Sequence, residues 1–293
     1  MKKSLPVLLT LAFILLACTP PGTTAPPPGP NLETMVAMTL EALTVAAPPP
    51  TVAPPTQSNA TNISYNNVSF LLSHDLATNA LAGSVPAVAP TTDGPGWDVA
   101  PEYIKFKLDN YAQFSGSHEA QILVYPAAEY ASVNESAARG LDQLRAILNG
   151  SAAPTADNLP AIPYFNAGQV FAAQIQTLQF RNGSGVRFLT EYAQYVATAN
   201  NADLFYEFQG LTTDGKYYII AILPISHPLL AYDANPDINV PTGGIPFPGV
   251  QDQNTITNYY TSVVGLLNSA APNSYSPTLT NLDALVQSIT VTP

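Results

Sequence analysis

The chain has few charged residues, few basic residues and a single cysteine. Only 10% of its 293 residues are charged, against roughly 25% in an average soluble domain. Nine Lys and Arg stand against twenty Asp and Glu, which gives a net charge of −11. This balance argues against a nucleic-acid partner, because too few cations are present to neutralise phosphates. A lone cysteine, Cys18, excludes an internal disulfide.

Long hydrophobic runs are also missing, apart from one at the N-terminus. Lys2 and Lys3 precede an apolar run of 13 residues, 5–17, and Cys18 follows it. A helix of that length would span roughly 20 Å, too short for a hydrocarbon core of about 30 Å. The segment therefore predicts a signal peptide over residues 1–17 rather than a transmembrane helix.

The end of this segment resembles the lipobox of bacterial lipoproteins. The residues that carry the resemblance are Leu15, Leu16, Ala17 and Cys18. The resemblance implies cleavage before Cys18, a lipid such as palmitate on that cysteine, and a position on the extracytoplasmic face of a cell membrane. Two or three acyl chains suffice for stable anchoring, since each buried CH₂ contributes about 0.8 kcal/mol. Whether the membrane is an inner or an outer one is left open.

Residues 18–56 are predicted to be a tether. Eleven prolines fall within 19–56, and proline-rich stretches favour an extended, semi-rigid chain. Between the prolines, residues 31–47 have apolar residues at helical spacing, which predicts a short amphipathic helix. Such a helix could pair with copies of itself or lie on the bilayer, and the simpler interpretation is a fluctuating helix within the tether. Its apolar residues are Leu32, Val36, Leu40 and Leu43.

Residues 57–293 are predicted to form one α+β domain with an antiparallel sheet of about six to seven strands flanked by helices. Alternating apolar residues predict a first strand within 63–72, a half-buried strand at 102–108 and another at 121–125. Four further strands, 173–180, 186–194, 204–211 and 216–223, should form a meander. Asp214 and Gly215 suit the turn between the last two, and glycines at 183 and 185 suit the turn before the second.

Three helices are expected in this domain. Ser132 and Glu135 fit a capping box for a helix that ends near Gly150. Apolar periodicity predicts a second helix around 256–267 and a third around 279–289. The Pro- and Gly-rich segment 231–253 is predicted to be a long loop over one end of the sheet.

In element order the domain resembles the PsbP-like fold. The resemblance rests on the early strand residues 67–70, the central helix, the meander around 214–218 and the closing residues 282–289. It implies a non-enzymatic accessory or binding module. No catalytic residue can be transferred from it to this chain.

Catalytic patterns are scarce. Gly183, Ser184 and Gly185 lack the spacing of a nucleophile elbow, and His74, His118 and His227 have no partner at helical zinc-binding spacing. Glu191 and Glu207 could meet on neighbouring strands near Arg187 and act as a glycan-hydrolysing carboxylate pair. The alternative interpretation is a solvated sheet face with cross-strand charge pairs.

Two patterns could bind a ligand, namely a cluster of Asp and Asn residues and the many tyrosines, but each also has a simpler structural explanation. Oxygen-bearing side chains at alternate positions could wrap a cation such as Ca²⁺, but the glycine and glutamate of an EF-hand are missing and Asp and Asn are also turn formers. These side chains are Asp233, Asn235, Asp237 and Asn239. Tyrosines could stack on sugars, although core packing explains most of them. Trp97 is expected to close an edge of the core.

The sequence as a whole predicts a lipid-anchored extracytoplasmic module that binds an unidentified ligand or envelope protein without catalysis. The alternative is an envelope hydrolase that acts on glycans through paired carboxylates. Cys18 is the one assigned site residue, and no cofactor or metal is assigned.

Overall fold

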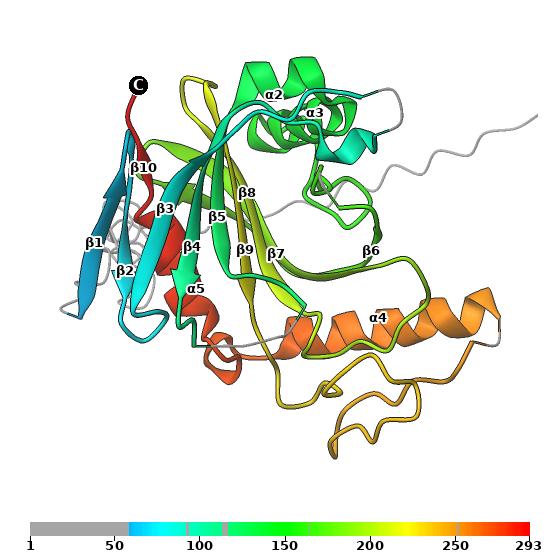
Figure 1. The fold of residues 1–293 in the computed structure, drawn as a ribbon. Coiled ribbons are helices and arrows are strands. Elements are labelled where there is room, and N and C mark those ends of the chain that lie inside the picture. The colour runs from blue at the N-terminus through cyan, green and yellow to red at the C-terminus, as the bar shows by residue number, and fades with distance from the viewer. Residues whose placement is uncertain (1–58, 92–93, 113–116, 164, 251) are drawn as a thin grey trace, which may run out of the picture. The chain divides into compact units, whose positions relative to one another are not determined.

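The computed structural model describes residues 59–91, 94–112, 117–163, 165–250 and 252–293 of the chain. All of them fall in one compact unit. A seven-stranded antiparallel sheet forms its centre, which confirms the predicted α+β class (Figure 1). In sheet order its strands are β3 (Asn79–Val85), β4 (Tyr103–Asp109), β5 (Gln121–Pro126), β9 (Tyr217–Pro224), β8 (Phe205–Thr212), β7 (Gly183–Ala193) and β6 (Gly168–Phe180).

Strands β6 to β9 form the predicted four-stranded meander. Gly215 has a φ of 72° in the last turn, and the Asp214 carboxylate accepts hydrogen bonds from Thr212 Oγ1 at 2.7 Å and Lys216 N at 3.1 Å. The first turn differs from the prediction, because it lies at residues 181–182 and Gly185 belongs to β7. Gly185 is needed there because a Cβ would lie 2.5 Å from the Phe208 ring.

A second, three-stranded sheet has the order β1-β2-β10. Its strands are β1 (Ala60–Tyr65), β2 (Val68–Ser73) and β10 (Thr290–Val291). The prediction of a single strand within 63–72 is therefore wrong, since a hairpin occupies this region. Asn66 takes a φ of 50° in the turn, a conformation that asparagine tolerates better than most residues.

Helices cover both faces of the large sheet, as residue alternation along the strands requires. Phe188, Phe205 and Tyr218 face the α2/α3 side, where they join a buried cluster with Leu141 and Leu144. The neighbouring strand residues face α4 and α5 and join a second cluster. The helices are α2 (Ala127–Val133), α3 (Glu135–Leu148), α4 (Gln253–Ser269) and α5 (Leu279–Gln287), with short 3₁₀ turns η1 (Gly96–Asp98) and η2 (Pro272–Ser274).

The central helix is capped by a different residue from the one predicted. Asn134 Oδ1 accepts a hydrogen bond from Ala137 N at 3.0 Å, and Asn134 Nδ2 donates to Val99 O at 2.9 Å. Ser132 belongs to the separate helix α2, where its hydroxyl donates to Glu129 O. Asparagine between two helices therefore replaces the expected capping box. Gly150 follows the helix with a φ of 77°, as expected of a C-terminal glycine.

Candidate ligand-binding groove

The predicted anchor lies outside the described residues. Cys18, the signal peptide, the proline-rich tether and the helix expected at 31–47 all fall in this part of the chain, as does the predicted domain boundary at residue 57. Among the described residues, no helix combines the length and the apolar character that a membrane crossing needs.

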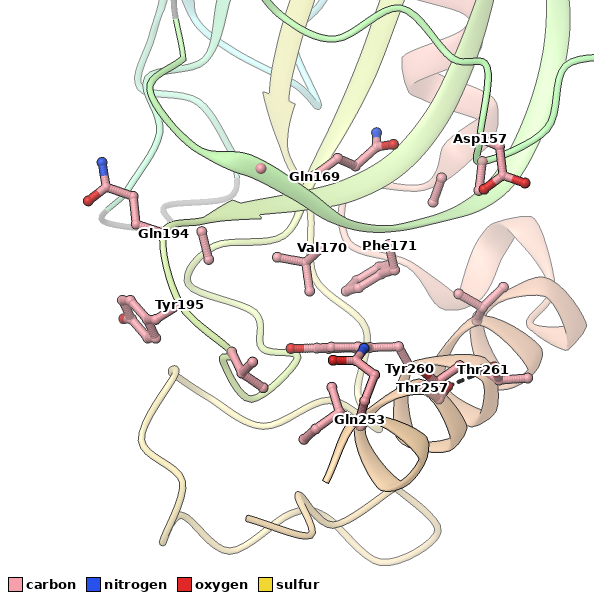
Figure 2. Close-up of a pocket in the computed structure, with 17 residues that line it drawn as sticks. Asp157, Gln169, Val170, Phe171, Gln194, Tyr195, Gln253, Thr257, Tyr260 and Thr261 are labelled. Atoms are coloured by element: carbon pink, nitrogen blue, oxygen red, sulfur yellow. Dashed lines mark hydrogen bonds between the residues drawn. The ribbon is translucent and has the colours of Figure 1, made fainter. Parts of the chain in front are cut away.

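A groove of about 760 Å³ lies between the edge strand β6 and helix α4 (Figure 2). We call it the β6–α4 groove. Its lining comes from β6, the end of β7 with the residues that follow, the outer side of α4, and two residues of the loop after α3. The lining residues are Ala156, Asp157, Gly168, Gln169, Val170, Phe171, Ala172, Ala193, Gln194, Tyr195, Val196, Gln253, Ile256, Thr257, Tyr260, Thr261 and Val264.

A β-bulge shapes the upper wall of this groove. The pairing of β6 with β7 shifts register between Gln169 and Phe171, so Val170 has no partner. In a regular strand, adjacent side chains point to opposite faces, but Figure 2 shows Val170 and Phe171 both directed toward α4 and Gln169 directed away. The bulge therefore gives the groove two adjacent apolar side chains.

A second bulge joins the two walls at one end of the groove. Gln174 has a φ of 53° where the β6 register shifts again. Its backbone N–H donates to Asn268 Oδ1 at 2.6 Å, and its side-chain amide donates to Leu267 O at 2.8 Å and to Ala270 O at 3.2 Å. Leu267 lies in the last turn of α4, where carbonyls lack the usual helical donors, and Ala270 is the residue that follows the helix. The Leu267 carbonyl also accepts from Ala270 N and from the Tyr275 hydroxyl. The strand therefore caps the helix and fixes the groove walls to each other.

Two tyrosines of α4 hold the segment after β7 against the groove. The Tyr260 hydroxyl donates to Ala197 O at 2.7 Å, and Ala197 N lies 3.2 Å from the same oxygen. The Tyr259 hydroxyl accepts from Ala199 N at 3.0 Å. Burial raises the pKa of Tyr259 to about 12, so this phenol stays neutral. Tyr260 thus has its hydroxyl engaged, while its ring lies 6.3 Å from Phe171 across the groove.

The lining is almost free of charge. Asp157, at one end, is the only carboxylate in the lining, and the lining contains no Lys, Arg or His. The floor is apolar, and the rim carries amides and hydroxyls from Gln194, Gln253, Thr257 and Thr261 (Figure 2). Such a surface is suited to an uncharged ligand, because a charged one would lose hydration without gaining a partner.

No protein-family model, curated protein or solved structure matches this chain. The geometry of the domain is therefore the basis for assigning a site.

The two candidate carboxylates do not converge. Glu207 lies opposite Phe188 in the β7/β8 register and so faces α3, whereas Glu191, three residues after Phe188, faces the opposite side. Both are fully buried, at 0% and 1% exposure, so the interpretation as a solvated face is wrong as well. Burial raises the pKa of each carboxyl well above its ordinary value. Two acids on opposite faces cannot act on one glycosidic bond.

Arg187 lies on the α5 side of the sheet and forms an ion pair with Asp283 of α5, not with Glu191 or Glu207. It is 4% exposed and pairs with Asp283 of α5, with Nε 3.2 Å from Oδ1. The Tyr206 hydroxyl donates to the same carboxylate at 2.9 Å. This cluster joins the sheet to α5 and opens into no described pocket, which indicates a structural role.

The histidines take separate, structural positions. His74 contacts Thr61 Oγ1 at 2.8 Å, and the His118 ring lies 4.6 Å from Phe205. His227 Nε2 lies 3.3 Å from Ser274 Oγ, but Nδ1 accepts from Leu229 N, which places the ring proton on Nε2. The Ser274 hydroxyl donates to Ala271 O. His227 is therefore not placed to take a proton from Ser274.

The alternating Asp and Asn cluster forms turns in the loop between β9 and α4. Asp233 Oδ1 accepts from Asn235 N, and Asn235 Oδ1 accepts from Asp237 N, each at 3.0 Å. These contacts are consecutive Asx turns, the simpler of the two roles considered. In the described part of the chain, no group of three or more His, Cys, Asp or Glu side chains could hold a metal ion. The long loop predicted for 231–253 is present up to the start of α4.

Core packing explains some of the aromatic residues but not all of them. Tyr206 and Tyr218 are fully buried, as core packing predicts, whereas Tyr195 is 69% exposed at the rim of the groove. Trp97 does not close the core. It is 39% exposed and lines a separate pocket of about 430 Å³. Tyr195 lies just beyond the end of β7, a position that strand alternation could not locate.

Proposed function

We propose that the protein is a lipid-anchored, extracytoplasmic binding module whose domain holds an uncharged ligand in the β6–α4 groove without converting it. The observation that carries this proposal is the lining of the groove, in which Asp157 is the only carboxylate and Lys, Arg and His are absent. An apolar floor with a few polar groups at the rim is typical of small-molecule sites, and about 760 Å³ lies within their usual range.

The proposal of binding without catalysis rests on the placement of ionisable groups. General acid–base chemistry needs a titrating side chain within hydrogen-bond reach of the substrate. The groove offers one exposed carboxylate, Asp157, and the buried Glu191 and Glu207 lie on opposite faces of the sheet. This arrangement favours a binding module over the glycan hydrolase that paired carboxylates would imply.

The anchor predicts a covalent lipid on Cys18. Cells that express the full chain and are fed a clickable palmitate analogue should label the wild type and leave Cys18→Ser unlabelled, because the cysteine sulfur is the only predicted attachment point. The Cys18→Ser variant should also be missing from the membrane fraction that detergent solubilises. Equal labelling of both proteins would contradict the lipobox assignment.

Binding in the groove can be tested by filling it. Isothermal titration of the full-length protein, in a detergent without a sugar headgroup, would use three sets of probes: neutral oligosaccharides, capped uncharged peptides and acidic oligosaccharides. At least one uncharged set should bind to the wild type. Thr257→Trp should abolish that binding, because residue 257 is exposed on the groove side of α4 and an indole would occupy the groove.

The matched control is Ser262→Trp, on the same helix at an exposed position that does not line the groove. It should bind as the wild type does. Binding of the acidic probes alone, no binding of any uncharged probe, or binding that survives Thr257→Trp would contradict the proposed function.

A further inference from the structure

We infer that the ligand of the β6–α4 groove is a neutral oligosaccharide, with the Tyr195 ring as a stacking surface for one sugar. This inference rests on the proposed function and adds the chemical class of the ligand. Three classes of uncharged ligand are compatible with a neutral groove, namely hydrocarbons, peptides and carbohydrates. The residues that line the groove distinguish among these three classes.

A hydrocarbon ligand does not suit the rim. Gln253 and Thr257 of α4 present an amide and a hydroxyl group along one wall, and the Thr261 hydroxyl, which donates to Thr257 O at 2.8 Å, lies beside them (Figure 2). Covering these groups with an aliphatic chain would remove water from them and return no hydrogen bonds. A ligand with hydroxyl groups would replace the lost water.

An extended peptide would need free backbone groups on β6, because edge-strand addition depends on a ladder of main-chain hydrogen bonds. The two bulges interrupt that ladder. A side chain of α4 also occupies part of it, because Gln174 N donates to Asn268 Oδ1 at 2.6 Å. The Arg187 guanidinium donates to Gln174 O. The edge of β6 therefore offers a poor template for a peptide strand.

A carbohydrate has hydroxyl groups for the polar rim and does not depend on a ladder of main-chain hydrogen bonds. A pyranose has an apolar C–H face, which packs on aromatic rings, and hydroxyls at its edge, which pair with neutral amides and hydroxyls. The groove places ring surfaces of Tyr195 and Tyr260 beside the polar rim formed by Gln194 and Thr257. Tyrosine combines a large apolar surface with low conformational cost on binding.

The backbone close to Tyr195 is anchored, although the Tyr195 ring is exposed. It lies two residues before Ala197, whose N–H and C=O both contact the Tyr260 hydroxyl. The ring itself is 69% exposed. An exposed aromatic side chain next to an anchored backbone segment, at the rim of a groove, offers its ring to a flat apolar ligand surface.

The test combines a glycan array with matched tyrosine variants of the full-length protein in a detergent without a sugar headgroup. Neutral glycans should be retained and acidic ones should not. For the best-retained glycan, titration should show an affinity about tenfold lower for Tyr195→Ala, since an aromatic contact of this kind contributes about one factor of ten. Tyr195→Phe should retain the affinity, because it keeps the ring.

The control is Tyr232→Ala, which removes a tyrosine that is 77% exposed outside the groove lining and should leave the affinity unchanged. Retention of no neutral glycan, or equal affinity of Tyr195→Ala and wild type, would overturn the carbohydrate inference. If the uncharged peptides bind and Thr257→Trp blocks them while glycans do not bind, only this inference fails. If no uncharged probe binds, the proposed function fails with it.

Discussion

Replacing Arg187 with methionine is expected to lower the free energy of unfolding by about 3–5 kcal/mol, because it removes a buried cation and leaves the carboxylate of the half-buried Asp283 without its charged partner. The guanidinium contacts Asp283 Oδ1 at 3.2 Å, Gln176 Oε1 at 2.7 Å and the carbonyl of Gln174. Burial raises the pKa of Asp283, and the positive charge of Arg187 counteracts that rise. Without Arg187, Asp283 and the Gln174 carbonyl in the β6 bulge both lose a charged donor.

Thermal unfolding of the full chain would measure this effect. With roughly 2–4 °C per kcal/mol for a domain of this size, Tm should fall by roughly 6–20 °C. The matched control is Arg145→Met, which breaks an exposed pair with Asp142 and should change stability by less than about 1 kcal/mol. Similar, small effects of the two substitutions would show that the Arg187 cluster does not stabilise the contact between the sheet and α5.

Replacing Glu207 with glutamine is expected to stabilise the protein at neutral pH and to flatten its stability profile. Burial raises the pKa of Glu207 well above the ordinary value near 4.5, and the Gln209 amide offsets this only in part. Glu191 is shifted in the same direction, also by burial. Between the ordinary and the raised pKa, the unfolded chain has released these protons while the folded chain still holds them.

The sign follows directly from this difference. The stability contribution of each glutamate is complete below about pH 4.5 and is lost as pH rises toward the raised pKa, at about 1.4 kcal/mol per pH unit and group. Hydrogen bonds from Thr212 and Thr255 lower the pKa of the exposed Asp214 and Asp252. Those two aspartates act in the opposite direction, and only below their ordinary values.

Glu207→Gln keeps the oxygen that accepts from Gln209 and removes the titrating group. At pH 7 it should be more stable than the wild type, and the gain should vanish near pH 4. Denaturant unfolding from pH 4 to pH 8 measures both curves, with Glu102→Gln as a control at an exposed glutamate. Parallel curves for wild type and Glu207→Gln would contradict the assignment of a buried, protonated acid.

Local sequence signals predicted the elements that depend on local physics. The meander follows from alternating apolar residues and the Asp214-Gly215 turn, and α4 follows from its apolar stripe. Strand β3 was missed because its small, exposed residues show no clear alternation, and it forms through pairing with β4 alone. The resemblance to the PsbP-like fold stays a prediction.

The candidate site could not be predicted in the same way, because it depends on register. The bulge at Val170 changes which β6 side chains face α4. No residue type at that position indicates a bulge. The faces of Glu191 and Glu207 depend on how β7 pairs with β8 across the irregular segment 194–204. The low proportion of charged residues in the sequence does agree with the site, since the groove lining is nearly uncharged.

The location of a bound ligand tests the central claim most directly. A crystal structure of the protein with the best-binding neutral oligosaccharide should place one sugar against the Tyr195 ring, with the chain running between Val170 and Tyr260 toward Thr257. A sugar bound instead in the pocket beside Trp97, or on a surface away from β6 and α4, would contradict the account.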